Sequence, residues 1–262
     1  MKYTPTLSKI TIYPVKSLDG ISLQKAVVTH GGCLLHDREY AITNEEGNYI
    51  IGKSNPLVHS LRTEFDLENS IISFRRQNES IVSQFNLTNE RSLIEKYLSD
   101  YFGEYIKFHQ NKTGRFLDIP DLSGVTVISN SSLETVSSWY NNLDVEEARR
   151  RFRATLEIAN VPAFWEDYLF TADGSRVEFK IGEVTIQGVN PRARCVVPTR
   201  HPLTGEVLFG FPKIFAKHRA ETLPVWSALE SHGHYYHLSV DCYIAPSEIG
   251  KSLSVGDELR IG

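Results

Sequence analysis

The chain has 262 residues, a formal net charge of −4 and a hydrophobic content of 41%. This length supports one large or two small domains with a hydrophobic core, and the composition is that of an ordinary globular protein, not of a disordered or fibrous one. The small acidic excess argues against a general nucleic-acid-binding surface, which normally carries a basic excess.

The three cysteines, Cys33, Cys195 and Cys242, include no Cys-x-x-Cys pair. A disulfide framework, an iron–sulfur cluster or a zinc cluster is therefore not indicated. No stretch approaches the length of a membrane-spanning helix, and the start of the chain lacks the apolar core of a signal peptide. We expect a cytoplasmic protein whose partners include neither a membrane nor a nucleic acid.

The first half of the chain shows short segments of alternating polarity separated by turns, which favours a mostly β structure. Strands are expected at residues 7–13, 21–29, 57–66, 71–75 and 81–86, and another begins near residue 40. One helix is expected at residues 91–102, where apolar side chains recur at helical spacing. The turn-rich segment at residues 112–124 is the expected boundary between two regions.

The second half continues the same pattern with a few helices. Further strands are expected at residues 125–128, 152–158, 177–180, 184–189, 235–244 and 258–261. Ser131 and Glu134 form a capping-box pattern that predicts the start of a helix, and a short helix is expected near residues 214–219. The run from Arg149 to Arg151 is interpreted as a solvated helix surface. The fold class is therefore mostly β, of the α+β type, with few helices.

Cys195 stands where an apolar strand becomes a turn-rich loop, and Arg194 precedes it directly. Nearby positive charge favours a thiolate, which acts either as a nucleophile or as a ligand to a soft metal. Three alternatives stay open: a small hydrophobic side chain in a core strand, a protease-type nucleophile with His201 or His218 as its base, and a metal ligand. The usual dinucleotide, nucleotide triphosphate, esterase and zinc-protease motifs are absent from the sequence.

Cationic and hydroxyl side chains recur at the ends of the expected strands. These residues are Lys16, Ser17, Arg38, Ser129, Arg153, Arg194 and Thr199. Collected around one thiolate, they would bind a phosphorylated, polyanionic cofactor that is attached to sulfur.

The same residues carry a family resemblance. The motif Ile-Tyr-Pro-Val-Lys-Ser at residues 12–17, the pair Asp37 and Arg38, the Arg153 strand and the segment from Arg194 to Gly205 follow one another in this order. Together they resemble the MOSC family, which takes its name from the C-terminal domain of molybdenum-cofactor sulfurases. The likeness extends over nearly the whole chain and is greatest to the amidoxime-reducing components and their bacterial relatives.

The resemblance implies a MOSC-type β-barrel core with an associated β-rich N-terminal region and a few peripheral helices. Residues 1–121 would form the N-terminal region and residues 122–262 the MOSC domain, and the two would share one site for a molybdenum-pyranopterin cofactor (Mo-molybdopterin). Cys195 matches the protein ligand to molybdenum and is the expected catalytic residue. The residues expected to bind the cofactor are Lys16, Ser17, Arg38, Ser129, Asn130, Arg153, Thr155, Arg194 and Thr199.

Three positions depart from the pattern of the reductases in this family. Thr155 stands where they carry asparagine, Asn130 where they carry an acidic residue, and Ala193 where they carry serine. These changes leave the metal ligand in place but alter hydrogen bonds around the cofactor, and with them the range of substrates.

The function implied is that of a molybdenum-dependent oxidoreductase, which reduces small N-hydroxylated compounds such as amidoximes and hydroxylamines by removing oxygen. Electrons would come from an external donor, a flavoprotein, cytochrome or ferredoxin, because the chain has neither an appended ferredoxin-like cysteine cluster nor the pyridoxal-phosphate domain of the long sulfurases. The alternative is a non-catalytic protein that carries the cofactor or sulfur on Cys195. A structural Cys195 in a fold that binds a small anion is the third hypothesis.

Overall fold

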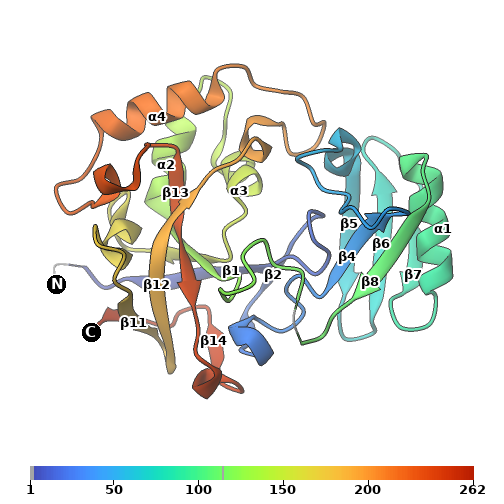
Figure 1. Ribbon diagram of the computed structural model, residues 1–262, viewed down its shortest axis with the longest axis horizontal. Helices are drawn as coiled ribbons and strands as arrows, with labels where there is room; N and C mark the ends of the chain where they lie inside the picture. The colour runs from blue at the N-terminus through green and yellow to red at the C-terminus, as the bar shows by residue number, and fades with distance from the viewer. Residues whose placement is uncertain (1–2, 114) are drawn as a thin grey trace.

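The computed structural model describes residues 3–113 and 115–262 (Figure 1). These residues form fifteen strands, four α-helices and six short 3-10 helices. The strands of the largest sheet come from both ends of the chain, in the order β15-β11-β12-β13-β9-β10-β1-β2. They are β1 (Thr6–Ile12), β2 (Ile21–Leu23), β9 (Thr126–Ser129), β10 (Leu156–Ala159), β11 (Val177–Ile181), β12 (Val184–Ala193), β13 (His237–Tyr243) and β15 (Leu259–Ile261).

The β15 end of this sheet contacts β1, the strand next to its other end. Thr6 bridges to Glu258, and the backbone N–H of Leu7 donates to the carbonyl oxygen of Asp257 at 2.8 Å, so the start of β1 joins the segment that leads into β15. Buried and partly buried residues alternate along most of β12, as expected for a strand with one face on a core. The curved sheet encloses the largest hydrophobic cluster of the described residues. The predicted mostly β fold of the α+β type is confirmed.

A smaller unit occupies the right of Figure 1 and has its own hydrophobic core. It contains a two-stranded sheet and a three-stranded sheet packed with one helix. Its elements are β4 (Tyr40–Asn44), β8 (Ile106–Gln110), β5 (Leu61–Asp66), β6 (Ile71–Arg76), β7 (Ser83–Asn86) and α1 (Arg91–Phe102). The bounds of α1 agree with the helix expected from the sequence, and its apolar face buries Ile94 and Leu98. Gly103 ends the helix in the left-handed conformation that glycine adopts at low cost.

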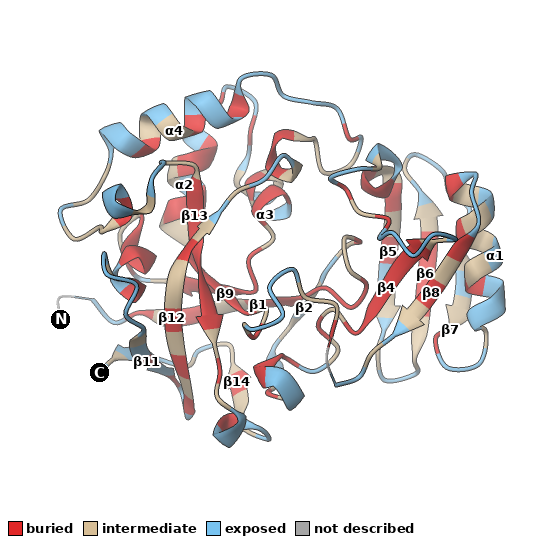
Figure 2. Cartoon of the chain, in the orientation of Figure 1, coloured by how far each residue is buried: buried red, intermediate tan, exposed pale blue. Residues whose placement is uncertain are grey.

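The remaining helices cover one side of the large sheet. They are α2 (Asn130–Ser138), α3 (Val145–Phe152) and α4 (Phe211–Glu221), and Figure 2 shows buried residues on their inner faces. Side chains of all three belong to a third hydrophobic cluster. The short elements are β3 (Lys25–Val27), β14 (Ser252–Ser254), η1 (His30–Gly32), η2 (Pro56–Ser60), η3 (Trp165–Leu169), η4 (Val197–Thr199), η5 (Leu229–His232) and η6 (Pro246–Glu248). Among the described residues, no helix has both the length and the apolar character needed to cross a bilayer.

Three local predictions are wrong. The strand expected at residues 57–66 begins only at Leu61, because its first residues belong to the 3-10 helix η2. The capping residue of α2 is Ser129, whose Oγ accepts from the N–H of Ser132 at 3.1 Å, whereas Ser131 donates its hydroxyl to the carbonyl oxygen of Val161. The expected strand at 152–158 begins only at Leu156, because α3 extends to the start of that range. The division at residues 121 and 122 stays a prediction, and strands from both sides of it pair within the large sheet.

Candidate functional site

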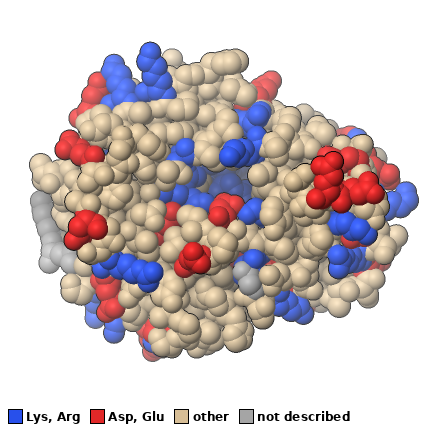
Figure 3. All heavy atoms as spheres, viewed as in Figure 1, with Lys and Arg blue, Asp and Glu red and all other residues tan. Residues whose placement is uncertain are grey.

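A cavity of about 890 Å³ is lined by residues of both the large sheet and the smaller unit. Its wall includes β1 and the turn after it, residues 51–64, helix α3, and the end of β12 with the loop that follows. The cavity is visible as the central hollow of the molecule in Figure 3. Its volume lies within the range typical of small-molecule and cofactor sites.

The wall of this pocket is strongly basic although the chain as a whole is acidic. Thirteen of its described residues are Lys or Arg and five are Asp or Glu, whereas the whole chain has a net charge of −4. Lys and Arg atoms line the hollow in Figure 3. Such a concentration of positive charge in a concave site favours an anionic ligand.

Cys195 lies in this wall, two residues after β12 ends. Of the three cysteines it is the exposed one, and its Sγ accepts from the N–H of Val197 at 3.4 Å. Burial raises the pKa of the Cys33 thiol to about 11 and also raises that of Cys242, so these two thiols are held in the neutral form. The alternative that Cys195 fills a core strand is therefore wrong.

The two histidines considered as the base of the protease-type alternative, His201 and His218, do not line the described wall of the pocket. The His218 ring stacks on Trp139, with ring centroids 5.5 Å apart, and His201 faces Glu147 at 3.8 Å. Neither contact places an imidazole where it could accept a proton from the Cys195 thiol.

Two predicted cations are held on one aromatic ring. The guanidinium groups of Arg153 and Arg38 lie 4.0 Å and 4.9 Å from the ring centroid of Tyr13, which is buried. Arg153 donates to the carbonyl oxygen of Leu18 at 2.7 Å, and Arg38 pairs with Asp37. Cation–π contact and hydrogen bonds together fix the orientation of both groups at the wall of the pocket.

The backbone is unusual at the predicted positions. Ser17, Arg38 and Arg153 have φ values of 72°, 49° and 53°, in the left-handed region that residues other than glycine seldom adopt. Backbone strain of this kind persists only where the surrounding structure enforces it, and it concentrates at functional sites. The three residues therefore have side chains that can bind an anion, and their backbone conformation costs conformational energy.

On the remaining side of the wall, four side chains are connected by ion pairs. Lys16 donates to Asp118 at 2.6 Å, Asp118 accepts from Arg192 at 3.3 Å, and Arg192 donates to Asp241 at 2.6 Å. Burial opposes ionisation of Asp118, but the hydrogen bond from Lys16 and the nearby cations lower the pKa of its carboxyl group. The network holds Lys16 and Arg192 in fixed positions.

Arg194 is fixed beside the thiol. It donates to the carbonyl oxygen of Phe152 at 2.6 Å, and its guanidinium carbon lies 5.2 Å from the ring centroid of Phe152. Burial, with the nearby charge of Arg192, lowers the pKa of Arg194 to about 10. The group is still protonated at neutral pH and stays cationic next to Cys195.

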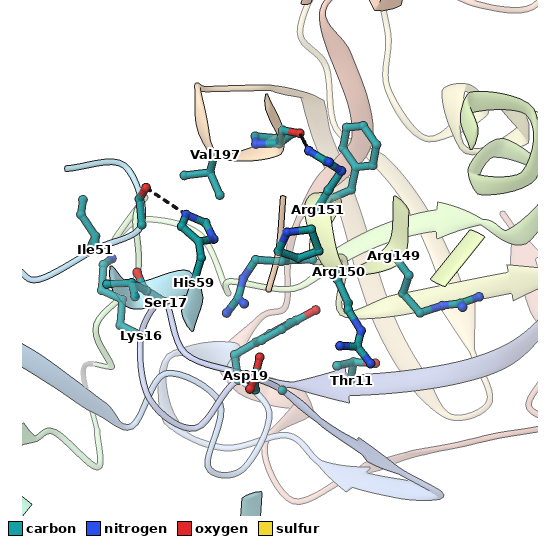
Figure 4. A pocket seen from close by; sticks show the side chains of 18 of the residues that line it. Thr11, Lys16, Ser17, Asp19, Ile51, His59, Arg149, Arg150, Arg151 and Val197 are labelled. Carbon is teal, nitrogen blue, oxygen red and sulfur yellow. Dashed lines mark hydrogen bonds between the residues drawn. The ribbon is translucent and has the colours of Figure 1, made fainter. Parts of the chain in front are cut away.

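The arginine run of α3 is not a solvated surface, contrary to the sequence-based interpretation. All three arginines line the pocket, and Figure 4 labels them on its wall. Arg151 is 4% exposed and pairs with Glu147 at 2.5 Å, and Arg149 pairs with Glu157 at 2.6 Å. Arg150 is exposed to the pocket.

Four of the residues expected to bind the cofactor lie outside the described wall of the pocket: Ser129, Asn130, Thr155 and Thr199. Ser129 caps helix α2, and Asn130 accepts from the hydroxyl of Ser8 at 3.2 Å. Thr155 is fully buried, and the Thr199 hydroxyl donates to a backbone carbonyl oxygen three residues earlier at 2.6 Å. Their hydroxyl and amide groups thus take part in local hydrogen bonds, and their contact with a cofactor stays a prediction.

Sequence reasoning brought together Lys16, Ser17, Arg38, Arg153, Arg194 and Cys195, and all six line the pocket. It missed other charged and aromatic residues of the wall: Lys9, Tyr13, Lys53, His59, Arg62, Arg75, Asp118, Arg192, Arg200 and Asp241. Tyr13 and Arg200 stand inside the motifs that carried the resemblance, and Arg192 stands three residues before Cys195, so their positions could have marked them. The others come from elements whose proximity to the thiol depends on the tertiary fold.

The chain is similar to several known proteins. Residues 4–102 match the family model of the MOSC N-terminal beta barrel domain. This part of the chain thus resembles the MOSC N-terminal domain. The relatives of the chain include mitochondrial amidoxime reducing component 2 from Bos taurus, which is 26% identical over 77% of this chain and 68% of that protein. The same component from Macaca fascicularis is 24% identical over 96% of this chain and 82% of that protein.

A second group of relatives is much longer. The molybdenum cofactor sulfurase of Caenorhabditis elegans is 24% identical over 78% of this chain, and the alignment covers 30% of the sulfurase. The chain thus spans about a third of that sulfurase and about two thirds of the bovine component. The family resemblance inferred from the motifs is confirmed by the family model and by these two groups of relatives, of which the sulfurases are named for the molybdenum cofactor.

Proposed function

We propose that this MOSC protein is a molybdenum-dependent oxidoreductase that removes oxygen from small N-hydroxylated compounds. The observation that carries the proposal is the position of Cys195, an exposed thiol in the wall of a basic pocket that also contains the five other predicted residues. Relatives named amidoxime reducing components support the reaction class. Strands and loops from both predicted regions, residues 1–121 and 122–262, would share the site.

The chemistry of the donor set fits a phosphorylated molybdenum cofactor. A thiolate is a soft ligand, which suits molybdenum, and Arg194 supplies positive charge beside it. Lys16, Arg38 and Arg153 would hold the phosphate and the pterin end through charge-assisted hydrogen bonds. When bound, the cofactor supplies the two-electron chemistry that removes oxygen from an N–OH group.

The protein itself positions the reactants. Cys195 would hold the metal end of the cofactor, and the Tyr13 ring would keep Arg38 and Arg153 directed at its anionic end. The conversion of N–OH to N–H consumes two electrons and two protons and releases one water molecule. Because the three cysteines of the chain build no electron-transfer cluster, the electrons would come from an external flavoprotein, cytochrome or ferredoxin.

The proposal is tested with protein purified from a molybdenum-sufficient host. Benzamidoxime is supplied together with reduced methyl viologen as the electron donor, and the benzamidine formed is measured by chromatography. We expect turnover in the wild type and its loss in Cys195→Ser, whereas Lys213→Gln on the exposed face of α4, outside the pocket, is the matched control. Protein that contains molybdenum but reduces none of several amidoximes and hydroxylamines would contradict the reductase.

A second candidate is a protein that carries the cofactor or sulfur on Cys195 without catalysis. The exposed thiol and the sulfurase relative favour it. Intact-mass analysis of freshly purified protein separates the two functions, because a carrier would show the stable addition of one sulfur atom on Cys195. Turnover by protein without that addition would exclude sulfur carriage as the main function.

A further inference from the structure

The cations of the pocket are not all neutralised. Six of them form ion pairs with carboxylates: Lys16, Arg38, Arg62, Arg149, Arg151 and Arg192. The other seven have no carboxylate partner among the described residues: Lys9, Lys53, Arg75, Arg150, Arg153, Arg194 and Arg200. Only Arg153 and Arg194 of these seven belong to the proposed cofactor site. The pocket therefore contains more positive charge than that site accounts for.

Three of these unpaired cations, Arg75, Arg150 and Arg200, form a second group together with Arg62, which we call the arginine lobe. Its members come from four different places in the fold, β5, β6, α3 and the residue after η4. Arg62 is the best anchored of the four. It pairs with Asp19 at 3.0 Å and donates to the carbonyl oxygens of His59 and Pro202 at 2.6 Å and 3.4 Å.

The lobe holds like charges close together. Burial is the largest cause of the lowered pKa of Arg62, and the positive charges of Arg150 and Arg75 lower it further. Burial, then Arg200, Arg153 and Arg62, lower the pKa of His59, so this imidazole is neutral and adds no charge. The carboxylates that line this part of the wall are Asp19, already paired with Arg62, Glu146, already paired with Arg149, and the exposed Glu64. Clustered guanidinium groups of this kind repel each other unless an anion lies between them.

Arg150 is the member that is free to bind. It is exposed, it lines the pocket, and its side chain makes no hydrogen bond or ion pair with the residues that the structure describes. Arg149 and Arg151, its neighbours on α3, are both paired with carboxylates. Figure 4 shows the three arginines of α3 in the same pocket as Lys16 and Ser17 of the proposed cofactor site.

We propose that the arginine lobe binds an oxyanion of the substrate, a carboxylate or a phosphate, so that the preferred N-hydroxylated substrates carry a negative charge. Guanidinium groups recognise both oxyanions through paired charge-assisted hydrogen bonds. The inference rests on the proposed function for the reaction itself, but it concerns a separate group of residues. It makes the lobe a specificity determinant that acts on a part of the substrate distant from the reacting N–OH group.

Two measurements test the lobe. The first compares kcat/KM for 4-carboxybenzamidoxime and benzamidoxime, which share the reacting group and differ by one carboxylate. The second measures binding of 4-carbamoylbenzoate, phenyl phosphate and benzamide by calorimetry, which requires no turnover. Both are made on the wild type, on Arg150→Gln and on the control Lys213→Gln, and the molybdenum content of each protein is determined alongside.

We expect the wild type to favour the carboxylate substrate and the anionic ligands, and Arg150→Gln to reduce that preference roughly tenfold. The control should match the wild type, and added salt should weaken the preference because the pocket is open to solvent. Binding of phenyl phosphate but not of 4-carbamoylbenzoate would identify phosphate as the source of the oxyanion. A preference for anionic ligands without turnover of any amidoxime would support the lobe and contradict the reductase.

Equal kcat/KM values and equal affinities for neutral and anionic compounds would overturn the lobe while leaving the reductase intact. A loss of molybdenum in Arg150→Gln would also overturn it, because Arg150 would then belong to the cofactor site.

Discussion

Glu166 gives the stability of this fold a defined pH dependence. Its side chain is 1% exposed and accepts from the hydroxyl of Ser132 at 2.9 Å. Burial, and then the charge of the neighbouring Asp167, raise the pKa of Glu166 from 4.5 to about 7. The Glu166 carboxylate thus binds a proton more tightly in the folded protein than in the unfolded chain. The resulting stabilisation is complete below pH 4.5 and is lost as the pH rises through about 7.

The separation between the two pKa values corresponds to about 3 kcal/mol of unfolding free energy. The perturbation is Glu166→Gln, which keeps a side-chain oxygen for Ser132 but removes the titration. Urea unfolding of wild type and variant is measured from pH 4.5 to above pH 7. Relative to the variant, the wild type should lose about 3 kcal/mol over this range.

The control is Glu183→Gln, which changes an exposed carboxylate in the turn between β11 and β12. Its stability should follow that of the wild type at every pH. Contributions of other titrating groups are common to all three proteins and cancel in the differences. Parallel curves for wild type and Glu166→Gln would refute the reasoning, because they would mean that Glu166 has the same pKa in the folded and unfolded states.

Two further predictions concern buried charge and thiol reactivity. Arg219 is 2% exposed and pairs with the buried Asp167. Arg219→Leu would leave that carboxylate unpaired and should therefore lower the unfolding free energy by about 3–5 kcal/mol. An unchanged urea midpoint would contradict this prediction. Iodoacetamide should modify one cysteine of the folded protein, Cys195, because Cys33 and Cys242 are buried with raised pKa values; early labelling of either buried thiol in a peptide map would refute the assignment.

Elements with a strong local pattern could be predicted from the sequence. The helix at residues 91–102 has its bounds confirmed, because its apolar stripe and terminal glycine are local signals. The pairing of β1 with β10 could not be predicted, since nothing local marks which distant strand completes a ladder. The start of α2 was misplaced by two residues because Ser129 and Ser131 are equally suitable caps in sequence, and only the tertiary fold gives Ser131 another acceptor.

Pocket residues could be predicted from the sequence where they stand in the motifs of the family resemblance. Lys16, Arg38 and Cys195 stand in motifs that the family resemblance connects, and the structure places them in one pocket. Arg150 was assigned to a solvated surface because a run of arginines on a short helix is normally exposed to bulk water. The smaller unit lies across the pocket from this helix and turns that surface into an interior wall, which no local pattern reveals.

The molybdenum content of the purified protein tests the central claim most directly. Wild type and Cys195→Ser are produced in the same molybdenum-sufficient host and analysed by inductively coupled plasma mass spectrometry, with circular dichroism to verify folding. We predict close to one molybdenum atom per wild-type chain and a loss of most of the metal in Cys195→Ser, because the thiolate is the expected protein ligand. Equal molybdenum in the two proteins, or none in the wild type, would contradict the account.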